Sequence, residues 1–460
     1  MKPARRLLGL LLASVLVLTA ACGGDDDAAS DDQSGDEATE QGATLRVPED
    51  HDTIQAAVDA AAPGDLILVG PGTYEEAVTV ETDELTIRGL DRNEVILDGG
   101  FELDNGIRVV GASGVAVENM TARNYTNNGF FWTGSEGYRA SYVTTYRIGD
   151  YGVYAFDSTK GLIEHSYASG SPDAGFYIGQ CYPCDAVIDG VVSEFNGLGY
   201  SGTNSGGNLL IVNSTFRNNR AGVVPNSGTY ELCYPERDTT IVGNRVYDNN
   251  QSDSPAIEVA FDAQGNGILV AGGVGNTIER NRVWDHDLTG IGLVPFPETD
   301  ASDVEPPADN DDLPCSEARE LPTADPADIP ETVLWNPRDN SVVGNVVEDS
   351  RLADIGVGSL VDVSGMNNCF ADNEISTTAP ADLEALAPCE GEGSGGDWAN
   401  GALDFTPFLA EKPPSGDYKT SPVPEAQETM PDAESAPARP ATDVPPSVDL
   451  DAIEVPDKPS

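Results

Sequence analysis

The chain has 460 residues, and its 24 Lys and Arg against 78 Asp and Glu give a formal net charge of −54. A surface this acidic repels phosphate backbones, so we expect no nucleic-acid partner. Because 39% of the residues are hydrophobic and only 22% are charged, the chain can bury a core, and its 49 glycines favour turn-rich β structure.

Residues 1–21 have the pattern of an export signal, with a basic start and an apolar run from Leu7 to Ala21 that is too short to span a bilayer. The run ends at Cys22 in a segment that resembles a bacterial lipobox. We therefore expect a lipid anchor on Cys22 and attachment to the outer leaflet of the cell membrane; ordinary secretion is the alternative. Residues 22–43, rich in Gly, Ser, Ala and acids, predict a flexible tether.

An amphipathic helix is predicted at residues 53–61, where the apolar side chains share one face and Pro63-Gly64 ends the pattern. The residues of this face are Ile54, Ala57, Val58 and Ala61. A short helix at the start of a repeat domain is suited to cover its first edge.

A 23-residue repeat follows. A glycine that precedes alternating apolar residues recurs at Gly106, Gly129, Gly152, Gly175, Gly199, Gly222, Gly267 and Gly290. A fixed period of this kind indicates one supersecondary unit stacked many times.

A second signature in the repeat is an apolar pair that leads into an asparagine and a β-forming residue. It occurs at Asn119, Asn213, Asn244, Asn281, Asn345 and Asn373. Asparagine tolerates the left-handed conformation of a tight corner, and its amide can bond to the equivalent amide one rung away. These asparagines therefore have a structural role in this interpretation.

Short strands on either side of such corners, with no helical period, predict an all-β fold, a single right-handed parallel β-helix of about nine to ten coils over residues 44–410. The segment 297–330, rich in Pro, Asp and Glu, is predicted to leave the coil as an insertion. Residues 411–460 contain eleven prolines and predict a disordered or extended tail.

The start of the repeat region also resembles a known family. The residues concerned are Thr53-Ile54-Gln55-Ala56-Ala57-Val58-Asp59-Ala60-Ala61, Pro63-Gly64-Asp65, Ile67, Val69, Pro71-Gly72-Thr73-Tyr74, Glu76 and Val78. This run resembles the opening of the pectate-lyase-like β-helix superfamily, and the asparagine coils are similar to those of secreted bacterial β-helix proteins that bind or hydrolyse carbohydrates. The resemblance covers residues 45 to 376 and implies the fold; it does not select a reaction, since lyases, hydrolases, epimerases, esterases and adhesins share it.

Strand alternation places Phe131, Tyr154 and Tyr177 in one outward column, one rung apart, with Phe156 nearby. A row of outward aromatic rings is typical of a sugar-stacking platform. The alternative is that a loop covers the row as a small satellite core.

Ionisable groups lie beside this row. Asp150 and Asp173 occupy the same coil position, so their carboxylates could share a proton or hold calcium. Asp157 is followed at equivalent positions by Gln180 and Asn204, which we expect to contact substrate.

Further catalytic candidates are Lys160, the only lysine between the tether and residue 410, and His165, which replaces a corner asparagine. Tyr146 and Arg147 are additional candidate proton carriers. A structural role at the corner is the alternative for His165, and a solvated acidic face is the alternative for the carboxylates.

Three reaction classes fit these residues. A polysaccharide lyase or epimerase would use a base together with calcium at Asp150 and Asp173, whereas a glycoside hydrolase would use two carboxylates among Asp150, Asp157 and Asp173. The Gln and paired-Asp motifs expected of a pectin methylesterase are absent, and no histidine spacing predicts a zinc site.

Six cysteines besides Cys22 are consistent with an oxidising compartment. We expect the pairs Cys181–Cys184, Cys233–Cys315 and Cys369–Cys389. A redox-active role for Cys181 and Cys184 is the alternative to a structural clip, but the thioredoxin context is absent.

The expected function is recognition, with cleavage or epimerisation as an option, of an extracellular polysaccharide by a monomeric, lipid-anchored β-helix. The rival is a non-catalytic surface scaffold or adhesin-like protein. Metal delivery is a weaker alternative, because His and Met clusters are absent.

Overall fold

The computed structural model describes residues 42–257, 259–299, 313–318, 332–361, 365–391, 394–396, 398 and 402–459. The predicted signal peptide, the expected lipidation site Cys22 and most of the tether and of the insertion 297–330 lie outside the described residues.

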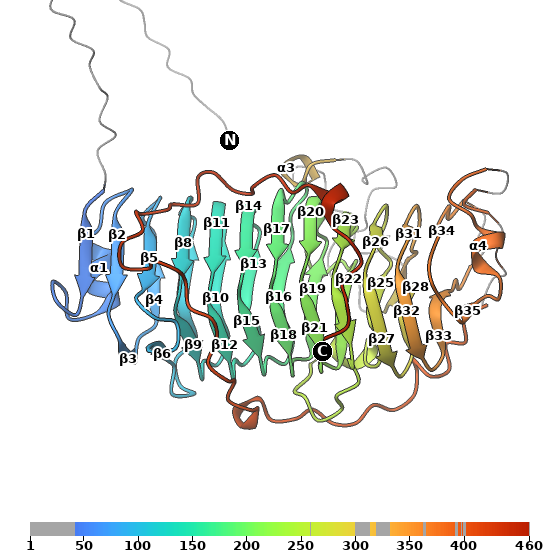
Figure 1. Cartoon of the computed structure of the whole chain (residues 1–460), viewed down its shortest axis with the longest axis horizontal. Coiled ribbons are helices and arrows are strands. Elements are labelled where there is room, and N and C mark those ends of the chain that lie inside the picture. The colour runs from blue at the N-terminus through green and yellow to red at the C-terminus, as the bar shows by residue number, and fades with distance from the viewer. Residues whose placement is uncertain are drawn as a thin grey trace, which may run out of the picture. The chain divides into compact units, whose positions relative to one another are not determined.

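Each repeat makes three short strands separated by corners, and each strand pairs in parallel with the equivalent strand of the next coil (Figure 1). The register follows the sequence period, since Phe130 pairs with Val153 and Val153 with Phe176. Within the described residues three long parallel sheets result, called sheets A, B and C below, with 12, 10 and 11 strands. The number of strands in sheet B agrees with the predicted number of coils. Sheets A and C have more strands because the end coils are incomplete.

Sheet A contains β1 (Thr44–Val47), β2 (Leu66–Val69), β5 (Thr86–Gly89), β8 (Val115–Glu118), β11 (Glu136–Ser141), β14 (Thr159–Glu164), β17 (Ala186–Asp189), β20 (Gly206–Val212), β23 (Arg237–Val242), β26 (Thr277–Glu279), β31 (Ser341–Val343) and β34 (Cys369–Ala371). Sheet B contains β3 (Gly72–Tyr74), β6 (Val95–Asp98), β9 (Thr121–Arg123), β12 (Thr144–Tyr146), β15 (Tyr167–Ser169), β18 (Val192–Glu194), β21 (Thr215–Arg217), β24 (Arg245–Tyr247), β27 (Arg282–His286) and β32 (Val346–Ser350).

Sheet C contains β4 (Val78–Val80), β7 (Asn105–Val110), β10 (Asn128–Thr133), β13 (Val153–Phe156), β16 (Ala174–Gly179), β19 (Leu198–Thr203), β22 (Ala221–Asn226), β25 (Ile268–Ala271), β28 (Thr289–Val294), β33 (Ala353–Val357) and β35 (Thr378–Ala379). At the base of the insertion, β29 (Phe296–Glu298) and β30 (Val333–Trp335) form an antiparallel pair. The helices are α1 (Ile54–Ala60), α2 (Val259–Asp262), α3 (Cys315–Ala318) and α4 (Leu383–Leu386), with 3-10 turns at Tyr418–Thr420 and Leu450–Ala452.

The repeated glycines are explained by close approach of neighbouring coils. A Cβ on Gly152 would lie 2.5 Å from the carbonyl oxygen of Gly175 and 2.6 Å from Oγ1 of Thr145, so no larger residue fits. The alternation after each glycine directs side chains as predicted, because the inward residues are fully buried. They are Ile107, Val109, Phe130, Trp132, Val153, Ala155, Phe176, Ile178, Ile268 and Val270.

The corner asparagines form ladders. Asn244, Asn281, Asn345 and Asn373 are linked in that order by amide-to-amide hydrogen bonds of 3.0 Å along successive coils. Their predicted structural role is confirmed, because each bond satisfies polar groups that the corner buries.

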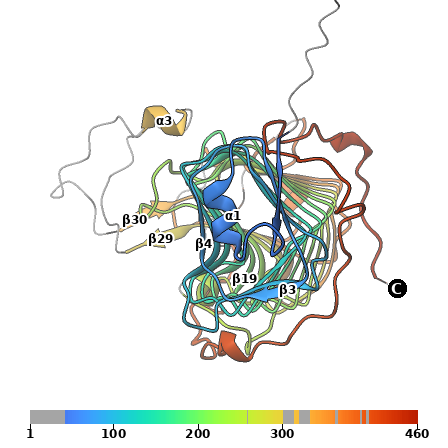
Figure 2. The ribbon, with the colours of Figure 1, turned by 90° about the vertical axis from the view of Figure 1, so that its left-hand side faces the viewer.

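The predicted helix is α1, and it covers the first end of the β-helix (Figure 2). Thr53 caps it by accepting a hydrogen bond from the backbone N–H of Ala56, and Ile54, Ala57 and Val58 are buried against the first coils. Of the described helices, none is both long and apolar enough to cross a membrane.

The C-terminal segment, residues 411–459, differs from the expected disordered tail. It has little secondary structure but lies against the outside of the coils (Figure 1). Arg220 donates to the carbonyl oxygen of Pro413 at 3.0 Å, and Arg88 donates to that of Ala436 at 2.7 Å. Prolines keep this backbone extended and leave its carbonyls free to accept from arginines of the coils. Composition alone could not reveal these partners.

Candidate functional site on the outer face of sheet C

Phe131, Tyr154 and Tyr177 lie in register on β10, β13 and β16, as predicted. The ring centroids of Phe131 and Tyr154 are 5.0 Å apart in a stacked arrangement, and those of Tyr154 and Tyr177 are 4.8 Å apart. Phe156 lies beside the row, 5.7 Å from Tyr154. The predicted aromatic column is therefore present on the outer face of sheet C.

Tyr151, which was not predicted from the sequence, belongs to the same cluster. Its ring is parallel to that of Tyr154 at 4.3 Å, and its hydroxyl donates to Oδ2 of Asp173 at 2.7 Å. Tyr151 precedes β13 in the corner, so strand alternation could not place it. Its position directly before Gly152 in the repeat was the only signal.

Exposure differs along the row. Phe131, Tyr154 and Phe156 are half-buried, whereas Tyr177 is 1% exposed. The hydroxyl of Tyr177 donates to the carboxylate of Glu231, which lies in the segment that joins β22 to β23. The first rings are thus partly exposed, whereas the last is covered by a loop, as the alternative interpretation expected for the whole row.

Glu231 is the second residue that sequence reasoning missed. The pKa of its carboxyl is raised to about 8, chiefly by burial; the hydrogen bond from Tyr177 lowers it and the nearby Asp173 raises it. Its Oε2 is buried and has no hydrogen-bond partner among the described residues. At neutral pH this carboxyl is mostly protonated. The only signal in the sequence was the longer spacing between Gly222 and Gly267.

The three tyrosines are also perturbed. Burial raises the pKa of Tyr151, Tyr154 and Tyr177 well above the usual value, and neighbouring carboxylates including Asp173 and Glu231 raise it further. These hydroxyls therefore stay protonated, and those of Tyr151 and Tyr177 donate hydrogen bonds to Asp173 and Glu231.

Asp150 and Asp173 lie on neighbouring coils as predicted, since the backbone N–H of Asp173 donates to the carbonyl oxygen of Asp150 at 3.3 Å. Among the described residues, no group of three or more His, Cys, Asp or Glu side chains could hold a metal ion. A calcium ion at these two aspartates would need other oxygen ligands.

The corner after sheet C carries Asp157, Gln180 and Asn204 at equivalent positions, all with positive φ. Gln180 is 8% exposed and Asn204 is fully buried, and both bond to the segment that carries Glu231. Their expected substrate contacts are thus replaced, in this structure, by contacts to the protein.

Lys160 lies beyond this corner on β14. Its ammonium group donates to Oε1 of Glu136 at 2.5 Å, and this partner raises the lysine pKa. Lys160, Asp157 and Gln180 line a cleft of about 370 Å³ beside the disulfide of Cys181. The lysine is therefore next to, and not within, the aromatic row.

His165 lies elsewhere. It occupies the corner between sheets A and B, with its ring 4.8 Å from that of Tyr142. The structural alternative fits this placement better than a catalytic role. Tyr146 accepts from Arg123 on sheet B, and Arg147 donates to the carbonyl oxygen of Ser421 in the C-terminal segment.

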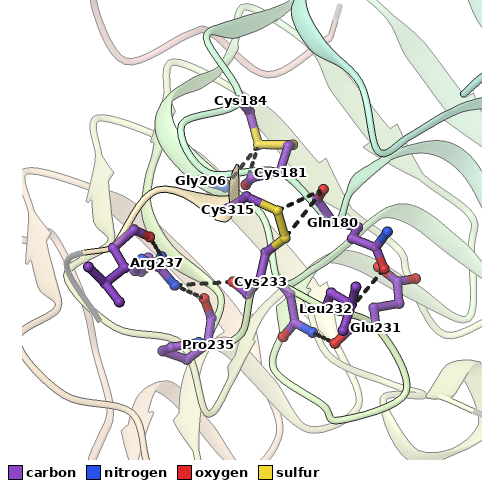
Figure 3. The surroundings of a disulfide bond; sticks show 12 residues. Gln180, Cys181, Cys184, Gly206, Glu231, Leu232, Cys233, Pro235, Arg237 and Cys315 are labelled. Carbon is purple, nitrogen blue, oxygen red and sulfur yellow. Dashed lines mark hydrogen bonds between the residues drawn. A yellow bond between two sulfur atoms is a disulfide. The ribbon is translucent and has the colours of Figure 1, made fainter. Parts of the chain in front are cut away.

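The three predicted disulfides, Cys181–Cys184, Cys233–Cys315 and Cys369–Cys389, are confirmed. Figure 3 shows that the disulfide Cys233–Cys315 lies against Gln180. Cys233 follows Glu231 closely in the sequence. The disulfide ties the segment that carries Glu231 to α3.

A family model agrees with this fold. Residues 128–295 match the family model described as a right handed beta helix region. The A-module of the mannuronan C-5 epimerase AlgE4 from Azotobacter vinelandii is a similar solved structure, with 15% identity over 71% of this chain and 91% of that chain and a TM-score of 0.45. An alginate lyase from Paenibacillus sp. str. FPU-7 has 17% identity over 54% of this chain and 93% of that chain, with a TM-score of 0.37.

Pectate lyase Pel9A has 14% identity over 85% of this chain and 91% of that chain, with a TM-score of 0.36. No curated protein sequence matches the chain. The coils, their register and the matched region together show that the chain adopts a right-handed parallel β-helix fold.

Proposed function

We propose that this chain binds a polysaccharide across the outer face of sheet C and exchanges a proton with a bound sugar through Glu231. The observation that carries the proposal is the carboxyl of Glu231, with a pKa of about 8 and an unpartnered oxygen, at the covered end of a half-exposed aromatic row. Strongly perturbed ionisable groups beside a platform for ligand binding are typical of functional sites.

Binding would use Phe131 and Tyr154, whose half-buried rings can stack on the C–H face of a pyranose. Arg108 precedes Phe131 in the same column, one coil earlier, and is half-buried. A guanidinium beside a stacking platform favours an acidic sugar, because it can pair with a carboxylate in two-pronged geometry.

The chemistry would follow from the protonation states. A protonated Glu231 can donate to a glycosidic oxygen, as a hydrolase requires, or can bond to the carboxylate of a uronate, as a lyase or epimerase requires. Asp150 and Asp173 are the candidate bases; calcium bound to them would neutralise a substrate carboxylate if substrate or water supplied the missing ligands.

The similar structures named above include a mannuronan epimerase, an alginate lyase and a pectate lyase. Their likeness concerns the fold, so the proposed substrate class depends on the residues of sheet C. The proposed location is the cell surface, with a monomeric chain anchored through Cys22. The three disulfides are consistent with an oxidising compartment.

The test is a panel of neutral and uronate-containing polysaccharides, with and without calcium, followed by ultraviolet absorbance of unsaturated products, by new reducing ends and by binding calorimetry. We expect turnover of at least one acidic polysaccharide and a loss of about 100-fold or more in Glu231→Gln.

Glu236→Gln is the matched control. Glu236 is also buried with a pKa of about 8, but it bonds to Thr239 and Asn276 and does not face the row. If no polysaccharide binds and Glu231→Gln behaves as the wild type, the scaffold alternative replaces this proposal.

A further inference from the structure

Residues 227–236, called the Glu231 loop below, interrupt the repeat between β22 and β23. Two corner residues from the preceding coils, Gln180 and Asn204, lie beneath it. Their φ angles of 52° and 45° belong to the left-handed region, where asparagine is common and glutamine is rare. Such a conformation at a buried glutamine corner points to a role for its side chain.

Asn204 directs its whole amide to the loop. Its Nδ2 donates to the carbonyl oxygens of Gly228 at 2.6 Å and Glu231 at 2.7 Å, and its Oδ1 accepts from the N–H of Gly228 at 3.1 Å. One buried side chain therefore satisfies three backbone groups that have left the strand ladder.

Gln180 completes the arrangement from the coil before. Its Oε1 accepts from the N–H of Leu232 at 2.9 Å (Figure 3). The carbonyl of Glu231 and the N–H of Leu232 belong to one planar peptide group. Asn204 and Gln180 therefore hold both polar atoms of the peptide group that directly follows Glu231.

Other contacts hold the two ends of the loop. Thr229 donates through its backbone N–H to both carboxylate oxygens of Glu298 at 3.0 Å, and Cys233 is joined to Cys315. These contacts are made by other residues of the loop and do not involve the peptide group after Glu231. Its direction is fixed by Gln180 and Asn204.

We propose that Gln180 and Asn204 are positioning residues, which clamp the peptide group after Glu231 and so direct its carboxyl into the buried site at Tyr177. This inference rests on the proposed function, because it assigns their role through Glu231. It also explains why the two side chains, expected to contact substrate, are bonded to protein.

The test compares Gln180→Met and Asn204→Ala with the conservative Gln180→Glu, which keeps an acceptor for Leu232. Each variant is also made together with Glu231→Gln. The difference in unfolding free energy between a protein and its Glu231→Gln partner, measured against pH, reports the titration of Glu231 alone.

We expect the pKa of Glu231 to fall from about 8 by at least about one unit in Gln180→Met and Asn204→Ala, since a released carboxyl reaches water. In Gln180→Glu it should not fall, because the clamp is kept and a second carboxyl nearby raises the pKa of Glu231. Asn219→Ala is the matched control, because Asn219 is equally buried in an asparagine ladder away from the loop. Where turnover is measurable, its pH profile should move with the same pKa.

An unchanged pKa of Glu231 in both folded variants would overturn the positioning role. Because this measurement needs no substrate, it can succeed even if every polysaccharide fails, so failure of the positioning role and failure of the proposed function are separate results. If Asn204→Ala does not fold, Gln180→Met alone decides the question.

Discussion

The outer faces of sheets A and C each carry an apolar column and a covered carboxyl, but only the carboxyl on sheet A is paired with cations. On sheet A, Glu118 is fully buried beneath the C-terminal segment and pairs with Arg88 at 2.7 Å, with Arg139 at 3.9 Å. On sheet C, Glu231 is covered by tyrosines and, among the described residues, has no cationic partner. The first carboxyl is compensated, and the second is held at a raised pKa.

The apolar columns differ in the same way. On sheet A, Leu162, Val187 and Leu210 are in register and are covered by Val444 and Ile453 of the C-terminal segment. On sheet C, the first aromatic rings stay half-exposed. An outward apolar column therefore does not by itself indicate a binding site; the site is where the chain provides no cover and leaves a charge uncompensated.

Removal of residues 411–460 should have the largest effect. It would expose the column on sheet A and take the carbonyl acceptors of Ala436 and Arg439 from Arg88 and Arg139. We expect a loss of at least about 5 kcal/mol in unfolding free energy, or association of the chain, since several apolar side chains become exposed and two buried cations lose carbonyl acceptors while keeping Glu118. Thermal unfolding and size-exclusion chromatography measure both.

Val423→Ser is the control for the segment, because Val423 is 59% exposed. It should leave the melting temperature unchanged. A truncated chain that melts with the wild type and stays monomeric would contradict a covering role for the segment.

Arg88→Met tests the compensated carboxyl. It leaves Glu118 buried with only the more distant Arg139, so we expect a loss of about 3–5 kcal/mol, measured by chemical denaturation. The double variant Arg88→Met with Glu118→Leu should recover most of it, since an apolar pair needs no compensation. Lys160→Met breaks an exposed ion pair with Glu136 and should leave stability unchanged. Equal losses of unfolding free energy in Arg88→Met and Lys160→Met would show that burial of the ion pair under the segment does not determine its contribution to stability.

Much of the fold could be predicted from the sequence because it depends on local and periodic features. The 23-residue spacing of glycines such as Gly152 reports close packing between coils, and the asparagines at 244 and 281 report a corner repeated one rung apart. The C-terminal segment could not be predicted, since its order depends on arginines more than 100 residues away, such as Arg220.

The site was predictable only where it follows the repeat. The register of Phe131, Tyr154 and Tyr177 comes from strand alternation. Glu231 comes from an irregular loop, and its position depends on a disulfide and two corner side chains, which have no period. Long-range placement of this kind leaves no local pattern.

Glu231→Gln tests the uncompensated carboxyl of sheet C through the pH dependence of stability. Because burial raises the pKa of Glu231 from 4.5 to about 8, the wild type keeps the stabilising effect of a protonated carboxyl below pH 4.5 and loses it as pH rises to about 8. Relative to Glu231→Gln, we expect its unfolding free energy to fall by on the order of 3 kcal/mol over this range. Glu236→Gln should show a similar trend with normal polysaccharide binding. A flat difference for Glu231→Gln would mean that the carboxyl ionises freely.

Phe131→Ala should have the smallest effect, and it separates binding from stability. A half-buried ring that stacks on a sugar contributes about 1 kcal/mol, so we expect roughly fivefold weaker polysaccharide binding by calorimetry with little change in melting temperature. Phe101→Ala is the matched control, because Phe101 is also half-buried but packs edge-on against Tyr418 of the C-terminal segment, with the two ring centroids 6.0 Å apart. It should weaken attachment of that segment and leave binding intact. If Phe101→Ala weakened polysaccharide binding and Phe131→Ala did not, the binding face would lie on the covered side of the β-helix, and the exposed aromatic row would not mark the site.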